Sequence, residues 1–196
     1  AAGSVIYASG FFTAVGGTPR NYLAAIGTNG VLQPWNPEAN NLVMTIAFGS
    51  GTVYAGGAFL AIGGTPRNRL AAVDTAGNLL AWNPDAGNSV ETLAISGATI
   101  YVGGIFNTVA GVARNRVAAV STTGVLQSWN PSLDGPVYVI LVDGSTVYLG
   151  GLFSNVNGSA RSNLAAVDSN AALQSWNPGT DSTVNTLSLS GSNIYV

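Results

Sequence analysis

The chain has 196 residues, of which 47% are apolar and only 7% charged, and its net charge at pH 7 is -2. This composition indicates an ordered globular protein, and the lack of lysine or a basic surface argues against a nucleic-acid partner. The absence of cysteine and histidine excludes disulfides, thiol nucleophiles, thiolate metal sites and the commonest proton shuttle at neutral pH, so we expect no metal and no cofactor.

One segment returns along the chain at a constant interval of 47 residues. A period of roughly 40 to 50 residues is typical of propeller blades and solenoid coils. The copies are marked by a tryptophan column (Trp35, Trp82, Trp129 and Trp176), an arginine column (Arg20, Arg67, Arg114 and Arg161) and a tyrosine column that includes Tyr54, Tyr101 and Tyr148. No apolar run approaches the ~20 residues that would cross a bilayer, so we expect no membrane insertion.

In chain order, a partial repeat at residues 4–36 is followed by full repeats at 43–83, 90–130 and 137–177, and by a closing strand within 184–196. The third copy shows four runs of β-branched and aromatic residues, bounded by Gly, Asn, Asp, Ser and Pro: Val90–Ile95, Thr99–Gly103, Arg116–Val120 and Val125–Asn130. Such runs are typical of strands. The sequence therefore predicts an all-β protein with one four-stranded antiparallel sheet per repeat.

The segments between these runs carry turn signals. Asp74–Gly77 has a carboxylate that can start a turn and a glycine that can adopt positive φ, whereas the last copy has Ala171 in place of the glycine, which predicts a strained or altered turn there. Ala61–Arg67 and Asn83–Ser89 are predicted as longer loops. Because successive strands are antiparallel, these two loops should lie at the same end of the sheet.

The third run of each repeat is continuously apolar, as in Leu70–Val73 and Val117–Val120. Continuous runs of this kind predict strands covered on both faces. Sheets stacked face to face around an axis satisfy this, and the paired alanines allow neighbouring sheets to approach closely. We therefore favour a β-propeller, with a β-solenoid as the alternative architecture.

The order of the strands suggests how the array closes. The first repeat lacks a first strand, and residues 184–189 supply one, so pairing between the two ends would close a ring and hide an edge. Four blades would result from one chain, and eight from two chains that exchange ends as a homodimer. We favour the two-chain ring because the paired alanines suit near-flat stacking, although residues 189–196 duplicate residues 1–8 and one copy must be displaced.

The repeated text has three parts: Tyr-x-Gly-Gly-x-Phe, then Gly-Gly-x-x-Arg-Asn-x-Leu-Ala-Ala-Val-Asp, then Gly-x-Leu-x-x-Trp-Asn-Pro. It resembles the delta-60 type of bacterial β-propeller repeat, found in large, mostly exported proteins of unassigned activity, and the resemblance covers essentially the whole chain. It implies a propeller and an extracellular or cell-surface location, but no reaction. The departures are Ser9, Ala110, Asn157 and Ser162, which stand where the pattern has glycine or asparagine.

The arginine column is the best candidate for ligand binding, because four guanidinium groups on equivalent loops would suit carboxylates, phosphates or sulfated sugars. The competing interpretation is structural. Arg67 precedes the third strand and Trp82 ends the fourth, so the guanidinium could stack on the indole or donate to loop carbonyls or to loop acids such as Asp134 and Asp181. We favour the structural role.

The tryptophan column could stack on sugars, but we expect it to fill the seams between sheets. Glu38, Asp85, Asp134 and Asp181 lie in the loops at the arginine end, where a glycosidase would need two acids about 5 to 9.5 Å apart. No phosphate loop or nucleophile motif is present. The leading hypothesis is a non-enzymatic scaffold for protein contacts. A multivalent glycan or anion binder is the alternative, and a glycoside-active enzyme is the third.

Overall fold

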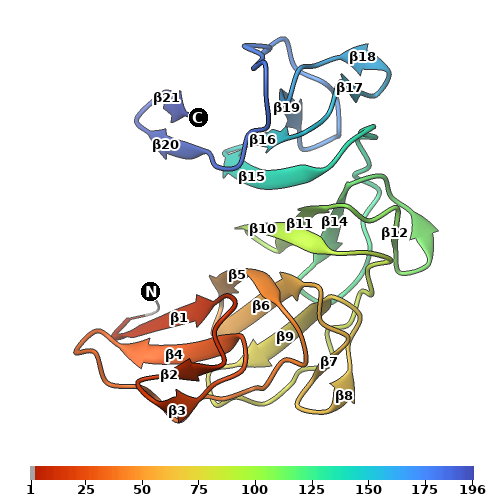
Figure 1. Ribbon diagram of the computed structural model, residues 1–196. Helices are drawn as coiled ribbons and strands as arrows, with labels where there is room; N and C mark the ends of the chain where they lie inside the picture. Colours follow the sequence, from red (N-terminus) through yellow and green to blue (C-terminus); the bar gives the residue numbers. More distant parts are fainter. Residues whose placement is uncertain (1–2) are drawn as a thin grey trace.

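The computed structural model describes residues 3–196, and within them the regular structure consists of strands alone. Figure 1 shows the strands grouped into sheets that follow one another along the chain. Three sheets are antiparallel and three-stranded, in the orders β5–β6–β9, β10–β11–β14 and β15–β16–β19. Their bounds are Val43–Gly49, Thr52–Gly57 and Leu70–Asp74; Val90–Ser96, Thr99–Gly104 and Val117–Ser121; and Val137–Asp143, Thr146–Gly151 and Leu164–Asp168.

Two-stranded sheets stand at the two ends of the array. In the first, β1 (Val5–Ser9) pairs with β4 (Leu23–Gly27), and in the last, β20 (Ser188–Ser190) pairs with β21 (Asn193–Tyr195). The 47-residue register makes β1 and β21 copies of the central strand β6, so the first sheet lacks a first strand and the last lacks a third strand. The all-β repeat array expected from the sequence is confirmed.

The expectation of four strands per repeat is wrong. The segment predicted as a fourth strand, Val125–Asn130, contributes a single isolated bridge between Leu126 and Val120, and the other repeats behave in the same way. Two further backbone bonds hold it, from Ser121 to Val125 and from Gln127 to Ala119. Beyond Gln127 the chain leaves the sheet, because the Trp129 indole donates a hydrogen bond to the Asp168 carbonyl oxygen of the next repeat.

A short hairpin lies in each long loop after the central strand, where the sequence predicted irregular structure. The four hairpins are β2–β3 (Ala14–Val15, Thr18–Pro19), β7–β8 (Ala61–Ile62, Thr65–Pro66), β12–β13 (Thr108–Val109, Val112–Ala113) and β17–β18 (Asn155–Val156, Ser159–Ala160). In the second repeat the turn residues Gly63 and Gly64 have φ values of 54° and 75°. Positive φ at both positions is the signature of a tight hairpin turn, which Gly-Gly favours.

The predicted turns between the third strand and the segment that follows are confirmed. The Gly77 N–H donates to the Asp74 carbonyl oxygen at 3.1 Å, and Gly77 has a φ of 94°. Ala171 adopts a φ of 67° while its N–H makes the equivalent bond to Asp168. A non-glycine residue in this region is disfavoured by its Cβ, so the expected strain at Ala171 is present.

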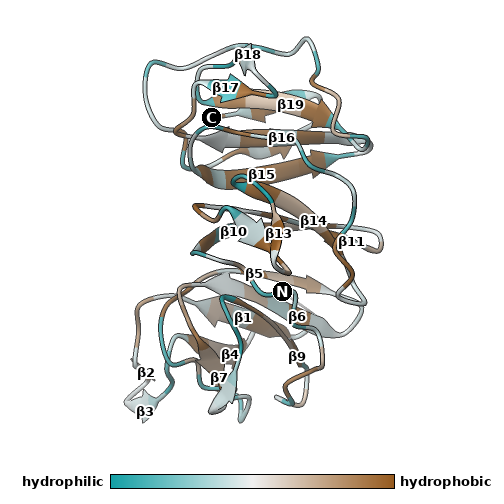
Figure 2. Ribbon diagram, turned by 90° about the vertical axis from the view of Figure 1, so that its right-hand side faces the viewer, coloured by the Kyte–Doolittle hydropathy of each residue, from teal (hydrophilic) through white to brown (hydrophobic). Residues whose placement is uncertain are grey.

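The core consists of seams between successive sheets. Residues Leu70–Val73 and Val117–Val120 are buried, as predicted for strands covered on both faces. One apolar cluster joins Tyr54 and Trp82 of one repeat to Ile100 and Phe106 of the next. Figure 2 shows the apolar strands as stacked layers, and β10 packs against both β5 and β15. Each repeat therefore completes the core of its neighbour.

The predicted pairing of the two chain ends is not made by the strands that the structure describes. Residues Ser188–Ser190 pair with β21 instead of with β1, and the β1–β4 sheet lies at the other end of the array (Figure 1). The reason is local, because β21 resembles β1 in sequence and follows β20 after a short turn. Closing a short loop costs less conformational entropy than joining distant ends.

Close packing at the seam depends on a glycine of the central strand. A Cβ added to Gly56 would lie 2.5 Å from Val90 Cγ1 of the next repeat and 2.9 Å from Thr45 Cγ2. We expect Gly56→Ala to lower the free energy of unfolding by about 1 to 3 kcal/mol through overpacking, as measured by chemical denaturation. Ser9→Ala is the matched control, since this column already carries a side chain there. A Gly56→Ala variant as stable as wild type would contradict this packing.

Candidate functional site

The arginine column is bonded to backbone carbonyl oxygens in every repeat. Arg67 Nη1 donates to the Pro66 carbonyl oxygen at 2.9 Å, and its Nη2 donates to the Leu80 carbonyl oxygen at 2.9 Å. The same two bonds, one to the preceding residue and one to the residue 13 positions later, are made by Arg20, Arg114 and Arg161 at 2.8–3.0 Å. Each guanidinium therefore ties its hairpin to the segment that approaches the tryptophan.

This arrangement turns the guanidinium groups toward their own repeats. The Nε atoms of Arg20, Arg67, Arg114 and Arg161 are buried without a hydrogen-bond partner. The loop acids have other donors, since Asp134 Oδ1 accepts from the N–H groups of Ser154 and Asn155 at 2.9 and 3.0 Å. Of the structural roles considered from the sequence, donation to loop carbonyls is the one that the bonds display.

The tryptophan column joins neighbouring repeats. Trp35, Trp82 and Trp129 are each 5% exposed. Their Nε1 atoms donate to the carbonyl oxygens of Asp74, Ser121 and Asp168 at 2.9–3.0 Å, and each acceptor ends the third strand of the following repeat. The expected place of the indoles in the seams is confirmed for these three, whereas Trp176 is only half-buried.

The tyrosine column packs against the tryptophan column. Tyr54 and Trp82 meet edge to face with ring centroids 5.1 Å apart, and Tyr101 and Trp129 do so at 4.9 Å. The pairs formed by Tyr7 and by Tyr148 are similar. Burial raises the pKa of the Tyr101 phenol above its usual value. These geometries are favourable for aromatic rings. Tyr54, Tyr101 and the first three tryptophans lie inside the core, whereas Tyr7, Tyr148 and Trp176 are half-buried.

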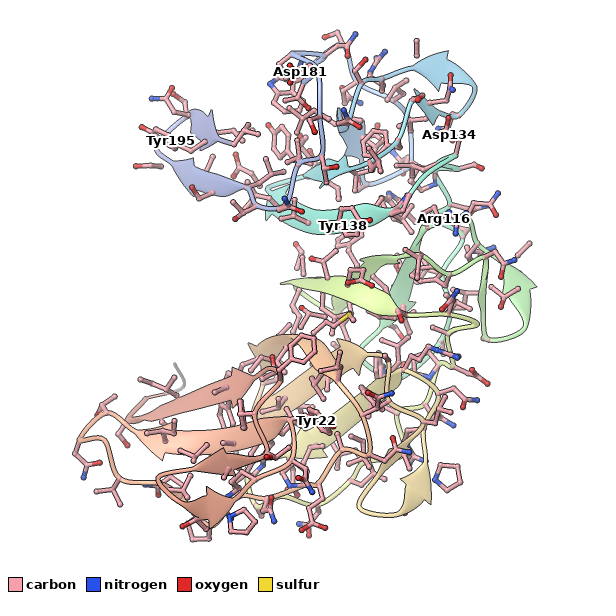
Figure 3. All side chains as sticks on the ribbon, viewed as in Figure 1. Tyr22, Arg116, Asp134, Tyr138, Asp181 and Tyr195 are labelled. Carbon is pink, nitrogen blue, oxygen red and sulfur yellow. The ribbon has the colours of Figure 1, made fainter. Side chains whose placement is uncertain are left out.

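A second bond crosses the seams at the loop end. Asn40 Oδ1 accepts from the N–H groups of Leu60 and Ala61 of the next repeat at 2.8 and 3.0 Å. Asp134, two repeats later, makes the equivalent pair of bonds to Ser154 and Asn155. Asp181 occupies the same column, and Figure 3 labels both acids in loops outside the strands.

The four loop acids are not brought together as a catalytic pair by the bonds they make. Glu38 accepts from Asn36 at 3.0 Å and Asp85 accepts from Asn68 at 3.1 Å, each beside its own loop. Among residues 3–196 no group of three or more His, Cys, Asp or Glu side chains is placed to hold a metal ion. The same residues contain no helix long and apolar enough to cross a membrane.

One strained column was missed by sequence reasoning. The residue just before each third strand has positive φ although it is never glycine: Tyr22 at 64°, Arg69 at 67°, Arg116 at 71° and Asn163 at 65°. Arg69 Nη1 donates to the Ala86 carbonyl oxygen at 2.9 Å, and Asn163 Nδ2 donates to the Thr180 carbonyl oxygen at 3.1 Å. Three different residue types share this backbone shape, so the sequence offers no signal for it.

The hairpin loops also carry exposed apolar side chains. We define the hairpin rim as residues 10–20, 57–67, 104–114 and 151–161. Phe11 is 82% exposed, and Leu60, Val112 and Leu152 are 47–50% exposed. Each of the four hairpin loops thus presents one exposed large apolar side chain, and isolated exposed apolar residues are ordinary on protein surfaces. Sequence reasoning overlooked them because the residue type at each of these positions differs from repeat to repeat.

Comparison with known proteins places the chain by fold alone. No protein-family model matches it, and no curated protein matches it either. Among solved structures it is similar to the computationally designed Ika8 protein, with a TM-score of 0.58 and 18% sequence identity. The match covers 88% of this chain and 48% of that one, so this chain spans about half the length of the designed protein. The structure thus defines an all-β array of three-stranded repeats.

Removing one guanidinium tests the structural role of the column. We expect Arg67→Ala to lower the free energy of unfolding by about 1.5 to 3 kcal/mol, because the charged bonds to two carbonyl oxygens are lost. Arg67→Lys should lose most of the same stability, since an ammonium group cannot reproduce the planar fork. Denaturant titration measures both. Wild-type stability in Arg67→Ala would contradict the structural role of the column.

The pH dependence of stability should reflect two carboxylates. The side chain and N–H of Asn78 hold the pKa of Asp74 below its usual value, with help from Ala76 and Gly77 and against the effect of burial. Burial raises the pKa of Asp134, but donors from Asn155 and Ser154 outweigh it, so this pKa is also lowered.

A lowered folded-state pKa contributes stability above the unfolded value of about 3.9, and this stability is lost as pH falls through the folded-state pKa. We expect the thermal midpoint of the wild type to fall more steeply below pH 4 than that of an Asp74→Asn, Asp134→Asn double variant. Parallel curves for the two proteins would refute this assignment.

Proposed function

We propose that this chain is the blade array of a β-propeller and that it serves as a non-enzymatic scaffold for protein contacts. The proposal rests on a contrast between the side chains that recur in every repeat, which are bonded within the array, and the exposed apolar side chains of the hairpin rim, which do not recur. The repeated arginines are used within their own repeats and the repeated tryptophans join repeats, while the unrepeated apolar side chains of the hairpin rim are exposed. Contact with a partner is therefore assigned to the rim.

The propeller closure is the finer part of this proposal. Three seams between successive sheets carry the same bonds and aromatic contacts, so each sheet is rotated and packed onto the next by one repeated interface. Identical interfaces applied in succession produce either a ring or an open superhelix. We favour the ring because it removes free strand edges, and the resemblance to exported propeller repeats suggests an extracellular setting.

A protein partner fits the rim better than a glycan or an anion. Phe11 and Leu152 belong to one column, which holds Ala58 and Ile105 in the other repeats. Apolar side chains around an equivalent set of loops form the kind of surface that proteins bury on association. The guanidinium groups, by contrast, already donate to carbonyl oxygens and have buried Nε atoms.

The proposal is tested by selecting ligands and then changing the rim. A phage-displayed peptide library and a glycan array are screened in parallel with the purified chain. We expect peptides to be enriched, and a Phe11→Ser, Leu152→Ser double variant to bind them at least about tenfold more weakly, because two apolar contacts are removed. Val125→Ser is the matched control, since Val125 is 63% exposed but lies in the turn region at the opposite end of its sheet.

Selective glycan binding that disappears in folded Arg67→Ala would overturn the protein-contact proposal in favour of a lectin. Equal loss of peptide binding in Val125→Ser would show that the rim is not the contact surface. Folding of every variant is checked by its thermal midpoint.

A further inference from the structure

We infer that the last seam of the array takes the β1–β4 sheet of a second copy of this chain, with β20 of one copy pairing with β1 of the other. This inference rests on the proposed closure of the repeats into a ring and names the residues that perform it. The two copies exchange these sheets around a two-fold axis, so the terminal sheet of each array is covered by the other. The occupant is defined by the three seams already present.

Every complete seam shows which groups the last one needs. In the three complete seams a tryptophan Nε1 donates to the last carbonyl of the next third strand. In two of them an Asn40-type side chain accepts from two N–H groups of the next loop. Applied to the fourth repeat, the 47-residue register assigns the Gly27 carbonyl oxygen to Trp176, and the N–H groups of Thr13 and Ala14 to Asp181.

The fourth repeat already holds its half of this interface. Tyr148 and Trp176 meet edge to face at 5.2 Å, as in the complete seams. They line a groove of about 550 Å³ together with Pro178 and residues of β21. Trp176 is half-buried although its three counterparts are 5% exposed. The groove is therefore a seam whose second wall is the two-stranded β20–β21 hairpin, without the third strand that supplies the indole's acceptor in the complete seams.

The strand β21 occupies the place of β1 in this groove. Ser188, Leu189 and Ser190 pair with Tyr195, Ile194 and Asn193, which are the register equivalents of Tyr7, Ile6 and Val5. The hairpin is short and its strands are mostly exposed, whereas β1 pairs with β4 over five residues. Tyr195 itself is 56% exposed and is labelled on β21 in Figure 3. The weaker pairing is therefore the one that is released.

A second copy fits this groove better than the chain's own first sheet. Figure 1 shows the β1–β4 sheet at the opposite end of the array from β20–β21. Bringing it to the groove within one chain would require all three seams to bend more sharply, although glycines such as Gly56 already leave no space at them. A second copy supplies the same sheet without changing any seam.

The inference is tested by a cysteine pair in a chain that has no natural cysteine. Ile6 and Leu189 are 44% and 36% exposed, and the register places them opposite each other in the exchanged sheet. Residues directly opposite in an antiparallel pair bring their Cβ atoms close to the distance that a disulfide requires. We expect the Ile6→Cys, Leu189→Cys variant to oxidise to a covalent dimer on a non-reducing gel.

The matched control is a variant in which a disulfide holds the β20–β21 hairpin closed. In Leu189→Cys, Ile194→Cys the disulfide would hold β21 on β20, and we expect this variant to remain a monomer by light scattering at concentrations where the wild type dimerises. Reduction should restore the wild-type behaviour. Peptide binding at the hairpin rim is measured on both variants, so that failure of closure is distinguished from failure of the scaffold proposal.

Three outcomes would overturn the inference. An intramolecular disulfide between the two cysteines introduced at positions 6 and 189, seen as a monomer without free thiols, would show that one chain closes on itself. Free thiols in a monomer would show that the two strands never meet. A ladder of oligomers would show open association in place of a closed pair.

Discussion

The hydrogen bonds from the indole N–H groups of Trp35, Trp82 and Trp129 to the next repeat hold successive sheets together. One sheet cannot bury both of its apolar faces, so the repeats are stable only as neighbours. The Trp82 indole reaches the Ser121 carbonyl oxygen across the seam, and Tyr54 packs against its ring. Within the repeat, Arg67 holds the segment that carries Trp82 in position. The arginine and tryptophan columns thus act together to hold each sheet against the next one.

The recurring columns are used in packing, so the side chains that vary among the repeats are the candidates for binding a partner. A side chain that recurs in every copy serves a structural requirement that all copies share, and here that requirement is packing between sheets. Residues that differ among equivalent loops, such as Phe11, are not constrained by this packing. The hairpin rim combines loops that the arginine column bonds in place with variable exposed side chains, and we propose it as a recognition surface on that ground. The seam chemistry itself reappears at the fourth repeat, where Trp176 and Asp181 present the same donor and acceptor to a neighbouring sheet of only two strands, which has no third strand.

Much of the fold followed from the sequence, because its periodicity and its apolar runs are direct consequences of packing. The first three strands of each repeat, the buried runs such as Leu70–Val73 and the strain at Ala171 were predicted correctly. The fourth strand was not, because Val125–Asn130 has strand-like composition while its backbone is diverted by contacts with Arg114 and by the Trp129 indole. The local pairing of β20 with β21 was missed for a related reason. Two similar strands compete for one place, and the sequence alone does not rank them. The positive φ at Arg69 could not be predicted, because the equivalent positions hold tyrosine, arginine and asparagine and never glycine.

The role of the indole bonds in the seams is tested by the free energy of unfolding of two tryptophan variants, measured at concentrations where the chain is monomeric. Trp82→Phe removes the donor to the Ser121 carbonyl oxygen and part of a buried ring. Trp176→Phe makes the same change where the neighbouring β20–β21 sheet has no third strand to accept from the indole. We expect a loss of about 1 to 3 kcal/mol for Trp82→Phe and a clearly smaller loss for Trp176→Phe. Equal losses at the two positions would contradict it, because the indole would then stabilise its own repeat and not the seam.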